Sequence, residues 1–314
     1  MAKLLPGCSA PHPVQVISRI KGDTPMASAS RAVLKWLRPP SVAGMALVAS
    51  IAGALSATPP LPAKKPDFTT EPDIGLLYAA SKAAKASELV PGAGYRLIEL
   101  ADFGLKIHVW SFDKSRYRLR AADKKDPHGS YVDELLGAKD LFAINGGFFE
   151  RDKQKVVKAS GLLIVDGREL APERDKAGSG IVYVTARSVF IGYRKDLADY
   201  SAMKSAVQVG PVLVDAGGKI GVANKQHDRQ NRSVVCLRAD GFVAVAVEGG
   251  LSLFQLASLL AAPAPDGIGC DSALNLDGGP STQALFRAGG HRIAVEGGWP
   301  VANALIVSPA ASSP

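Results

Sequence analysis

The chain has 314 residues, of which 47% are hydrophobic and 21% are charged, a balance typical of globular proteins. This balance excludes collagen-like, coiled-coil and wholly disordered chains. No apolar run reaches the roughly 20 residues of a membrane-spanning helix, which excludes a polytopic membrane protein. The 32 glycines and 21 prolines favour many turns and short strands over long helices.

The net charge of +8 is unevenly distributed along the chain. Residues 1–57 hold six basic residues and one acidic residue, so the remaining residues carry only +3. A basic protein can bind nucleic acid when its positive charge lies on one folded face. Because most of the excess lies in this first segment, we expect no nucleic-acid partner.

Residues 1–57 have the features of an export leader. An uncharged run from Val42 to Leu55 follows Arg31, Lys35 and Arg38 and has the length of a signal-peptide core. We expect an exported protein, periplasmic or secreted, with an uncleaved anchor as the alternative. Contact with a membrane is expected only through such an uncleaved leader.

The rest of the chain divides into a tether and one domain. Residues 58–88 are proline-rich and end in a short helix, and residues 89–314 form the domain. Apolar and alternating runs predict strands at residues 95–100, 105–112, 117–122, 141–146, 161–167, 180–185, 188–193, 206–214, 233–238, 242–248, 273–279, 282–287 and 302–308. We expect an α/β (mixed α+β) fold: a sheet-rich single domain with mixed strands and a few packing helices.

One helix is predicted between two of these strands. Ser252 followed by Gln255 has the form of a capping box, and an apolar stripe at helical spacing ends before Pro263. A strand-helix-strand passage brings the ends of two strands to one edge of a sheet. Glu248 and Asp277 would then lie at the same edge if their strands are neighbours.

Residues 143–149 contain a strand that stops at two glycines. Asn145 offers a donor and an acceptor, Gly146 and Gly147 expose backbone amides, and Phe148 could stack on a sugar. These residues are therefore candidates for substrate binding. A turn with two core phenylalanines remains the alternative.

Residues 273–282 repeat this design with a carboxylate. Asp277 ends a strand and is followed by Gly278 and Gly279, and then by the hydroxyls of Ser281 and Thr282. A carboxylate beside free amides and hydroxyls offers a base or nucleophile next to an anion-binding site. An Asp-Gly turn with hydroxyl caps is the alternative.

Glu248 is the second candidate for catalysis, because it also ends a strand and is followed by two glycines. Glycoside hydrolysis generally uses two carboxylates. Arg232 could clamp a phosphate, with Arg229 or His227 assisting. Alternatively, Glu248 is solvated or salt-bridged and the basic loop is simply solvated. Three other histidines are expected to be structural or exposed: His108, His128 and His291.

Cys236 and Cys270 are the two cysteines outside the leader. A disulfide in an oxidising compartment and two separate buried thiols remain open as alternatives. Their spacing matches no zinc pattern, and we expect no resident metal. Motifs of serine hydrolases, P-loop proteins, zinc proteases and dinucleotide-binding proteins are absent from the sequence.

Four segments, residues 143–149, 208–220, 231–260 and 273–283, together resemble the phosphodiester glycosidase family. This family includes the lysosomal mannose-6-phosphate uncovering enzyme and many exported bacterial proteins, and the resemblance covers about residues 141–307. It implies a mixed α/β domain that hydrolyses a sugar linked through its anomeric carbon to a phosphodiester. The family motifs fall on Asn145, Gly146, Gly147, Arg232, Asp277, Gly278, Gly279, Ser281 and Thr282.

Two positions depart from the family pattern. Glu248-Gly249-Gly250 stands where members often carry Asp-Gly-Arg, which removes a basic residue. Pro280 stands where members often have a third glycine, and this departure resembles a bacterial subgroup of the family.

The resemblance and the residue types lead to one mechanistic hypothesis. Asp277 or Glu248 activates water or attacks the anomeric carbon. The phosphate is held by Arg232, by the amides of Gly278 and Gly279, and by the hydroxyls of Ser281 and Thr282. The expected partner is a sugar-phosphodiester or anionic glycan.

Two alternatives stay open. One is a phosphodiesterase that cleaves the phosphorus-oxygen bond with a divalent cation held by Asp277, Glu248 or Asp271. The other is a module that binds anionic glycans without catalysis. The proposed glycosidase chemistry requires no cofactor, although a divalent cation is compatible with it.

Overall fold

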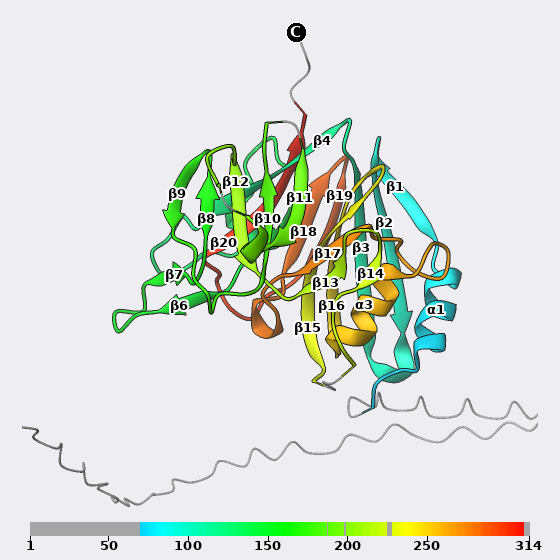
Figure 1. Cartoon of the computed structure of the whole chain (residues 1–314). Helices are drawn as coiled ribbons and strands as arrows, with labels where there is room; N and C mark the ends of the chain where they lie inside the picture. Colours follow the sequence, from blue (N-terminus) through cyan, green and yellow to red (C-terminus); the bar gives the residue numbers. More distant parts are fainter. Residues whose placement is uncertain (1–69, 187, 198, 225–227, 311–314) are drawn as a thin grey trace, which may run out of the picture. The chain divides into compact units, whose positions relative to one another are not determined.

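The computed structural model describes residues 70–186, 188–197, 199–224 and 228–310, all within the unit Leu61–Pro314. The predicted leader, residues 58–69 of the predicted tether and His227 lie outside the described residues. Every strand pairing in the described part of the chain is antiparallel, and the strands form three large sheets and one hairpin (Figure 1).

The largest sheet has eight strands in the order β1-β2-β3-β16-β15-β17-β13-β14. Its strands are β1 (Ala86–Val90), β2 (Ala93–Leu100), β3 (Leu105–Asp113), β13 (Val212–Asp215), β14 (Lys219–Ile220), β15 (Gln230–Arg238), β16 (Gly241–Leu251) and β17 (Ser272–Asn275). Ala239 and Asp240 form the hairpin turn between β15 and β16, and Gly241 pairs with Arg238 directly after it.

Two five-stranded sheets and a hairpin complete the strands. The first sheet, in the order β11-β10-β12-β8-β9, contains β8 (Leu163–Val165), β9 (Arg168–Ala171), β10 (Gly180–Val184), β11 (Val189–Tyr193) and β12 (Ser205–Val209). The second, in the order β19-β18-β5-β20-β4, contains β4 (Tyr117–Asp123), β5 (Phe142–Asn145), β18 (Ala284–Ala288), β19 (His291–Val295) and β20 (Asn303–Pro309). The hairpin pairs β6 (Phe149–Arg151) with β7 (Val157–Ala159).

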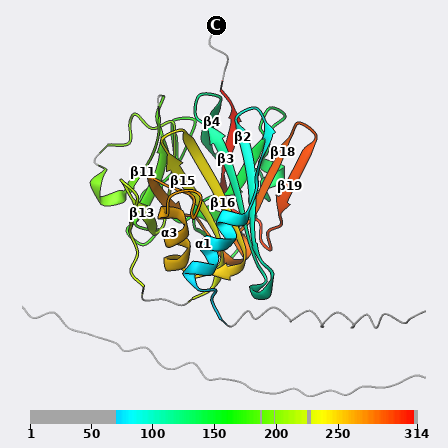
Figure 2. The same ribbon diagram turned by 90° about the vertical axis from the view of Figure 1, so that its right-hand side faces the viewer.

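Two helices cover one face of the eight-stranded sheet. Figures 1 and 2 show α1 (Ile74–Ala83) and α3 (Leu253–Ala261) side by side on that face, where Leu77 of α1 and Leu256 of α3 are buried in one cluster with valines of β15 and β16. Ser252 caps α3 as predicted, because its hydroxyl accepts a hydrogen bond from the Gln255 amide at 3.3 Å. The Ser252 amide donates to Glu71 rather than to Gln255, so a distant segment completes the cap.

The remaining helical segments are short. Helix α2 (Val132–Leu135) packs on the outer face of the sheet that contains β5. Three single turns of 3₁₀ helix are η1 (Ala101–Phe103), η2 (Arg194–Asp196) and η3 (Gly279–Ser281). Among the described residues, none of the helices has the length and apolar character that crossing a bilayer requires.

The main core lies between the other face of the eight-stranded sheet and the two smaller sheets. Trp110 of β3 contacts Phe142 of β5, with ring centroids 5.1 Å apart, and Phe112 contacts the same ring at 5.1 Å. Side chains at alternate positions along β15 and β16 therefore face either this core or the helices. This alternation decides which residues at the strand ends can share a site.

The sheet-rich fold and each predicted strand are confirmed, with three corrections. The run 206–214 is two strands in different sheets, because it breaks at Gly210-Pro211 and proline has no amide to continue a ladder. The predicted helix ends at Ala83 and residues 86–90 form β1, so part of the predicted tether belongs to the large sheet. The sheets are antiparallel rather than mixed in the described part of the chain.

Candidate functional site

The carboxyl ends of β16 and β17 lie at the same end of the large sheet. Strand β15 lies between them and is antiparallel to both, so β16 and β17 run in the same direction. Glu248 lies near the end of β16, and Asp277 follows the end of β17. The two strands are not neighbours, and two strand spacings separate their backbones by roughly 9–10 Å.

The loops that follow these two carboxylates line one depression of about 490 Å³. Its lining comes from the start of β15, from the glycine pair after Glu248 and from two residues of the loop after Asp277: Arg229, Gln230, Asn231, Gly249, Gly250, Gly279 and Pro280. The Asn231 carboxamide oxygen accepts a hydrogen bond from the Gly249 amide at 3.1 Å. Asn231 was not predicted from the sequence, because no local signal distinguishes it from a solvated loop residue.

Asp277 is a half-buried carboxyl whose protonation is altered by its surroundings. Burial raises its pKa above the ordinary value of 3.8, although hydrogen bonds from the Ser281 hydroxyl and the Gly278 amide oppose that rise. The Gly278 nitrogen lies 2.9 Å from the Asp277 carboxylate. Asp277 therefore holds a proton more readily than an exposed aspartate does.

The buried side chain of His108 orients Glu248 through a hydrogen bond. The sequence predicted only that His108 is structural or exposed, and gave no sign of this contact. Nε2 of His108 lies 2.9 Å from the Glu248 carboxylate, and Nδ1 of His108 lies 2.9 Å from the Tyr95 hydroxyl. The Glu248 side chain is 41% exposed, whereas that of His108 is 10% exposed. Trp110 stacks on the imidazole, with ring centroids 5.6 Å apart.

The protonation states fix the direction of these hydrogen bonds. Burial, and then the charges of Glu248 and Glu99, raise the pKa of Tyr95 to about 12, so its hydroxyl stays protonated. Burial lowers the pKa of His108, so the imidazole is neutral at pH 7. A carboxylate can only accept, hence Nε2 carries the proton and Nδ1 accepts from Tyr95. The Tyr95 hydroxyl therefore donates to His108, and His108 in turn donates to Glu248.

Asn145 binds protein groups rather than facing the depression, which differs from its predicted role. It is fully buried. Its nitrogen donates to the Asp277 carbonyl at 2.7 Å, and its oxygen accepts from the Ser233 hydroxyl at 2.6 Å and the Gln283 amide at 3.1 Å. The side chain thereby joins β5, β15 and the Asp277 loop.

The predicted substrate contacts at Gly146, Gly147 and Phe148 are also replaced by protein contacts. The amides of Gly146 and Gly147 donate to the carbonyl and the side-chain oxygen of Asn303. A Cβ at Gly146 would lie 2.1 Å from that side-chain oxygen, so only glycine fits. Phe148 packs against the main core.

The predicted phosphate cradle is also partly occupied by protein groups. Arg232 donates to the carbonyls of Leu251 at 3.1 Å and Asp228 at 2.7 Å. Burial lowers the pKa of its guanidinium. The Gly278 amide and the Ser281 hydroxyl bind Asp277, as described above. Thr282 is 2% exposed, and its hydroxyl has no hydrogen-bond partner among the described residues.

The three carboxylates considered as metal ligands are not brought together. Asp271 precedes β17 and Asp277 follows it, and six residues of extended chain span roughly 20 Å. Within the described residues, no group of three or more His, Cys, Asp or Glu side chains could hold a metal ion. A shared cation site that includes Asp271 is therefore incompatible with this fold.

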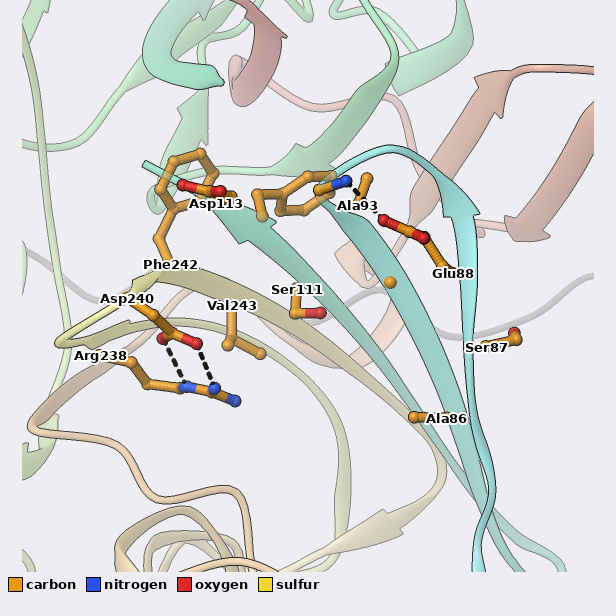
Figure 3. A pocket seen from close by; sticks show the side chains of 13 residues that line it. Ala86, Ser87, Glu88, Ala93, Ser111, Asp113, Arg238, Asp240, Phe242 and Val243 are labelled. Atoms are coloured by element: carbon orange, nitrogen blue, oxygen red, sulfur yellow. Dashed lines mark hydrogen bonds and ion pairs between the residues drawn. The ribbon is translucent and has the colours of Figure 1, made fainter. Parts of the chain in front are cut away.

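A cavity of about 540 Å³ lies at the opposite end of β16, between β1 and the β15–β16 hairpin (Figure 3). Its carboxylates are bound by protein groups: Glu88 by the Gly92 amide at 2.8 Å and Asp240 by Arg238 at 2.6 Å. Hydrogen bonds from Ser115 lower the pKa of Asp113. These groups resemble ordinary surface carboxylates, so the depression beside Asp277 is the better candidate.

The family model described as phosphodiester glycosidase matches residues 138–308, which include both carboxylates and both glycine loops. A search of curated proteins finds no match to the chain.

Three solved structures are similar at low identity. The catalytic domain of zebrafish N-acetylglucosamine-1-phosphodiester alpha-N-acetylglucosaminidase, auto-inhibited by its pro-peptide, has 17% identity and a TM-score of 0.49, with 72% of this chain and 83% of that chain covered. A hypothetical protein from Synechocystis has 15% identity and a TM-score of 0.48, with 72% of this chain covered but only 64% of that chain. A putative exported protein from Burkholderia pseudomallei has 16% identity and a TM-score of 0.45, with 68% and 74% covered.

Proposed function

This chain belongs to the phosphodiester glycosidase family, and we propose that it hydrolyses the bond between the anomeric carbon of a sugar and the oxygen of a phosphodiester. One observation carries the proposal: the glycines that directly follow Glu248 in β16 and the loop that follows Asp277 line a single depression. Most glycosidases use a pair of carboxyl residues to cleave the glycosidic bond.

The two carboxylates have different surroundings and therefore different roles. Glu248, exposed and bound by the His108 N–H, acts as the base that removes a proton from water. The water oxygen bonds to the anomeric carbon, and the bond from that carbon to the phosphate oxygen breaks. The electron pair leaves with the phosphate.

Asp277 handles the leaving group. Because its pKa is raised, it is the carboxyl better suited to give a proton to the departing oxygen. A phosphate monoester leaves readily as an anion, since its second pKa is about 6, so this proton contributes less than in an ordinary glycosidase. The charges of Arg229 and Arg232 beside the depression favour an anionic group there.

The spacing of the strands supports an inverting reaction. A water molecule fits between two carboxyl groups separated by roughly 6.5–9.5 Å, whereas retaining enzymes hold them at about 5 Å. The backbones of Glu248 and Asp277 lie two strands apart, and from this spacing we infer the wider separation of their carboxyl groups. Proton NMR during turnover should therefore show the opposite anomer first, and a first-formed product of retained configuration would contradict this assignment.

Export is part of the proposal. Cys236 and Cys270 form a disulfide, which is typical of proteins that fold in oxidising compartments. This bond supports a periplasmic or secreted location, together with the leader-like sequence of residues 1–57.

The test is a screen of sugar-1-phosphodiesters with wild-type protein and matched carboxylate variants. We expect Asp277→Asn and Glu248→Gln to lower kcat by about 10²–10⁴-fold with a small change in KM. Asp271→Asn removes a carboxylate at the far end of β17 and should keep the wild-type rate. Wild-type turnover by Asp277→Asn, or no turnover of any substrate by the wild type, would overturn the proposal.

A further inference from the structure

An exposed aromatic side chain lies beside the Asp277 loop. Trp299, in the loop between β19 and β20, is 48% exposed, although tryptophan is usually well buried. Exposed indoles on rigid backbone are used to stack against flat apolar faces, including the C–H face of a pyranose ring. Trp299 takes no part in the proposed chemistry, so its exposure calls for another role.

The backbone of Trp299 is fixed relative to the candidate catalytic residue. Its amide donates to the Pro280 carbonyl at 3.1 Å, and its carbonyl accepts from the Gln283 side chain at 2.9 Å. The amide of Gln283 in turn donates to Asn145, which binds the Asp277 carbonyl. A ligand stacked on Trp299 would therefore be held in a defined position relative to Asp277.

A cation lies against the same indole. The Arg151 guanidinium carbon lies 5.3 Å from the centroid of the Trp299 ring and 5.4 Å from that of Phe149, on strand β6 (Figure 1). Arg151 also donates to the Pro300 carbonyl at 3.4 Å. Within the described residues it forms no other hydrogen bond or ion pair, so N–H groups remain for a phosphate oxygen.

We propose that Trp299, Phe149 and Arg151 form a binding subsite for a phosphorylated glycan chain, next to the depression that holds the scissile linkage. The indole stacks on a sugar ring and the guanidinium binds a phosphate of the same chain. The inference rests on the proposed function, because it extends that substrate beyond the bond that is cleaved.

The test is calorimetric titration with a panel of glucose-, mannose-, galactose- and N-acetylglucosamine-based oligosaccharides, each phosphorylated and unphosphorylated. Trp299→Ala should weaken binding of the best phosphorylated glycan about tenfold. Arg151→Gln should weaken the phosphorylated form by about tenfold or more and leave the neutral form unchanged. The control is Phe190→Ala, which removes an equally exposed aromatic ring from β11, in another sheet.

The outcomes separate this inference from the proposed function. One outcome is glycan binding that depends on Trp299 and Arg151 while the same wild-type sample turns over no sugar-1-phosphodiester. This result would refute the proposed hydrolase activity and support the glycan-binding subsite. Turnover with glycan binding that both substitutions leave unchanged would overturn the subsite alone. Absence of binding to the whole panel would also overturn it.

Discussion

Nε2 of His108 lies 2.9 Å from the carboxylate of Glu248, although 140 residues separate the two in sequence. Antiparallel pairing of β3 with β16 places His108 opposite Ala246, two residues before Glu248 on the same face. The imidazole is neutral and its proton is directed at the carboxylate by Tyr95. Glu248 is therefore held in one orientation, directly before Gly249, which lines the depression.

Removing this hydrogen bond should impair turnover more than substrate binding. A hydrogen bond to a charged group contributes about 1.5–3 kcal/mol, so His108→Ala should lower kcat by about 10–100-fold. His108→Gln can keep an N–H donor toward Glu248 and should recover part of the rate. Steady-state kinetics of both variants, with melting temperatures as a control for folding, check this. Equal rates for His108→Ala and the wild type would show that the contact has no role in turnover.

The raised pKa of Asp277 should appear in the stability of the fold. The folded state binds this proton more tightly than the unfolded state, so the free energy of unfolding falls as pH rises from the ordinary value of 3.8 through the folded pKa. Asparagine cannot ionise. Asp277→Asn should therefore be more stable than the wild type at neutral pH, and the difference should shrink toward zero below about pH 4.

Urea unfolding at acidic and neutral pH measures this difference. Asp271→Asn, which removes an exposed carboxyl, controls for the loss of one negative charge. A stability difference for Asp277→Asn that does not vary with pH would contradict the burial argument.

Loss of Asn145 should destabilise the fold strongly. Asn145→Ala leaves the Asp277 carbonyl, the Ser233 hydroxyl and the Gln283 amide without their buried partner. Unsatisfied buried groups cost about 1–3 kcal/mol each, so we expect a loss of about 3 kcal/mol or more. Ser233→Ala removes one of the three contacts and should cost about 1 kcal/mol. Equal effects of the two substitutions in denaturant titrations would refute the role of Asn145 as the common partner.

The disulfide should contribute substantially to stability. Cys236 and Cys270 enclose a segment with a sequence separation of 34, for which the loop-entropy relation predicts about 4 kcal/mol. The double variant Cys236→Ala, Cys270→Ala should unfold at lower denaturant concentration than the oxidised wild type. The reduced wild type should behave like the variant. A thiol titration that finds both cysteines free in protein secreted from cells would contradict the disulfide.

Sequence patterns predicted the local structure well and the long-range contacts poorly. The strands on either side of the turn at Ala239-Asp240 and the helix after Ser252 depend on neighbouring residues, and all three are present. The partners of Asn145 and Glu248 depend on strand register between segments 88 to 140 residues apart, which no local pattern specifies. The sequence predicts that the amides of Gly146 and Gly147 bind substrate. In the structure both amides donate hydrogen bonds to Asn303, which lies 156 residues from Gly147.

The position of the bond that breaks tests the account most directly. Hydrolysis of a sugar-1-phosphodiester in ¹⁸O-labelled water, followed by mass spectrometry of both products, reports which atom the water attacks. Attack at the anomeric carbon places the label on the sugar and leaves the phosphate unlabelled. Label on the phosphate would mean that the phosphorus-oxygen bond is cleaved, and would contradict the assignment of Glu248 and Asp277 to glycosidic chemistry.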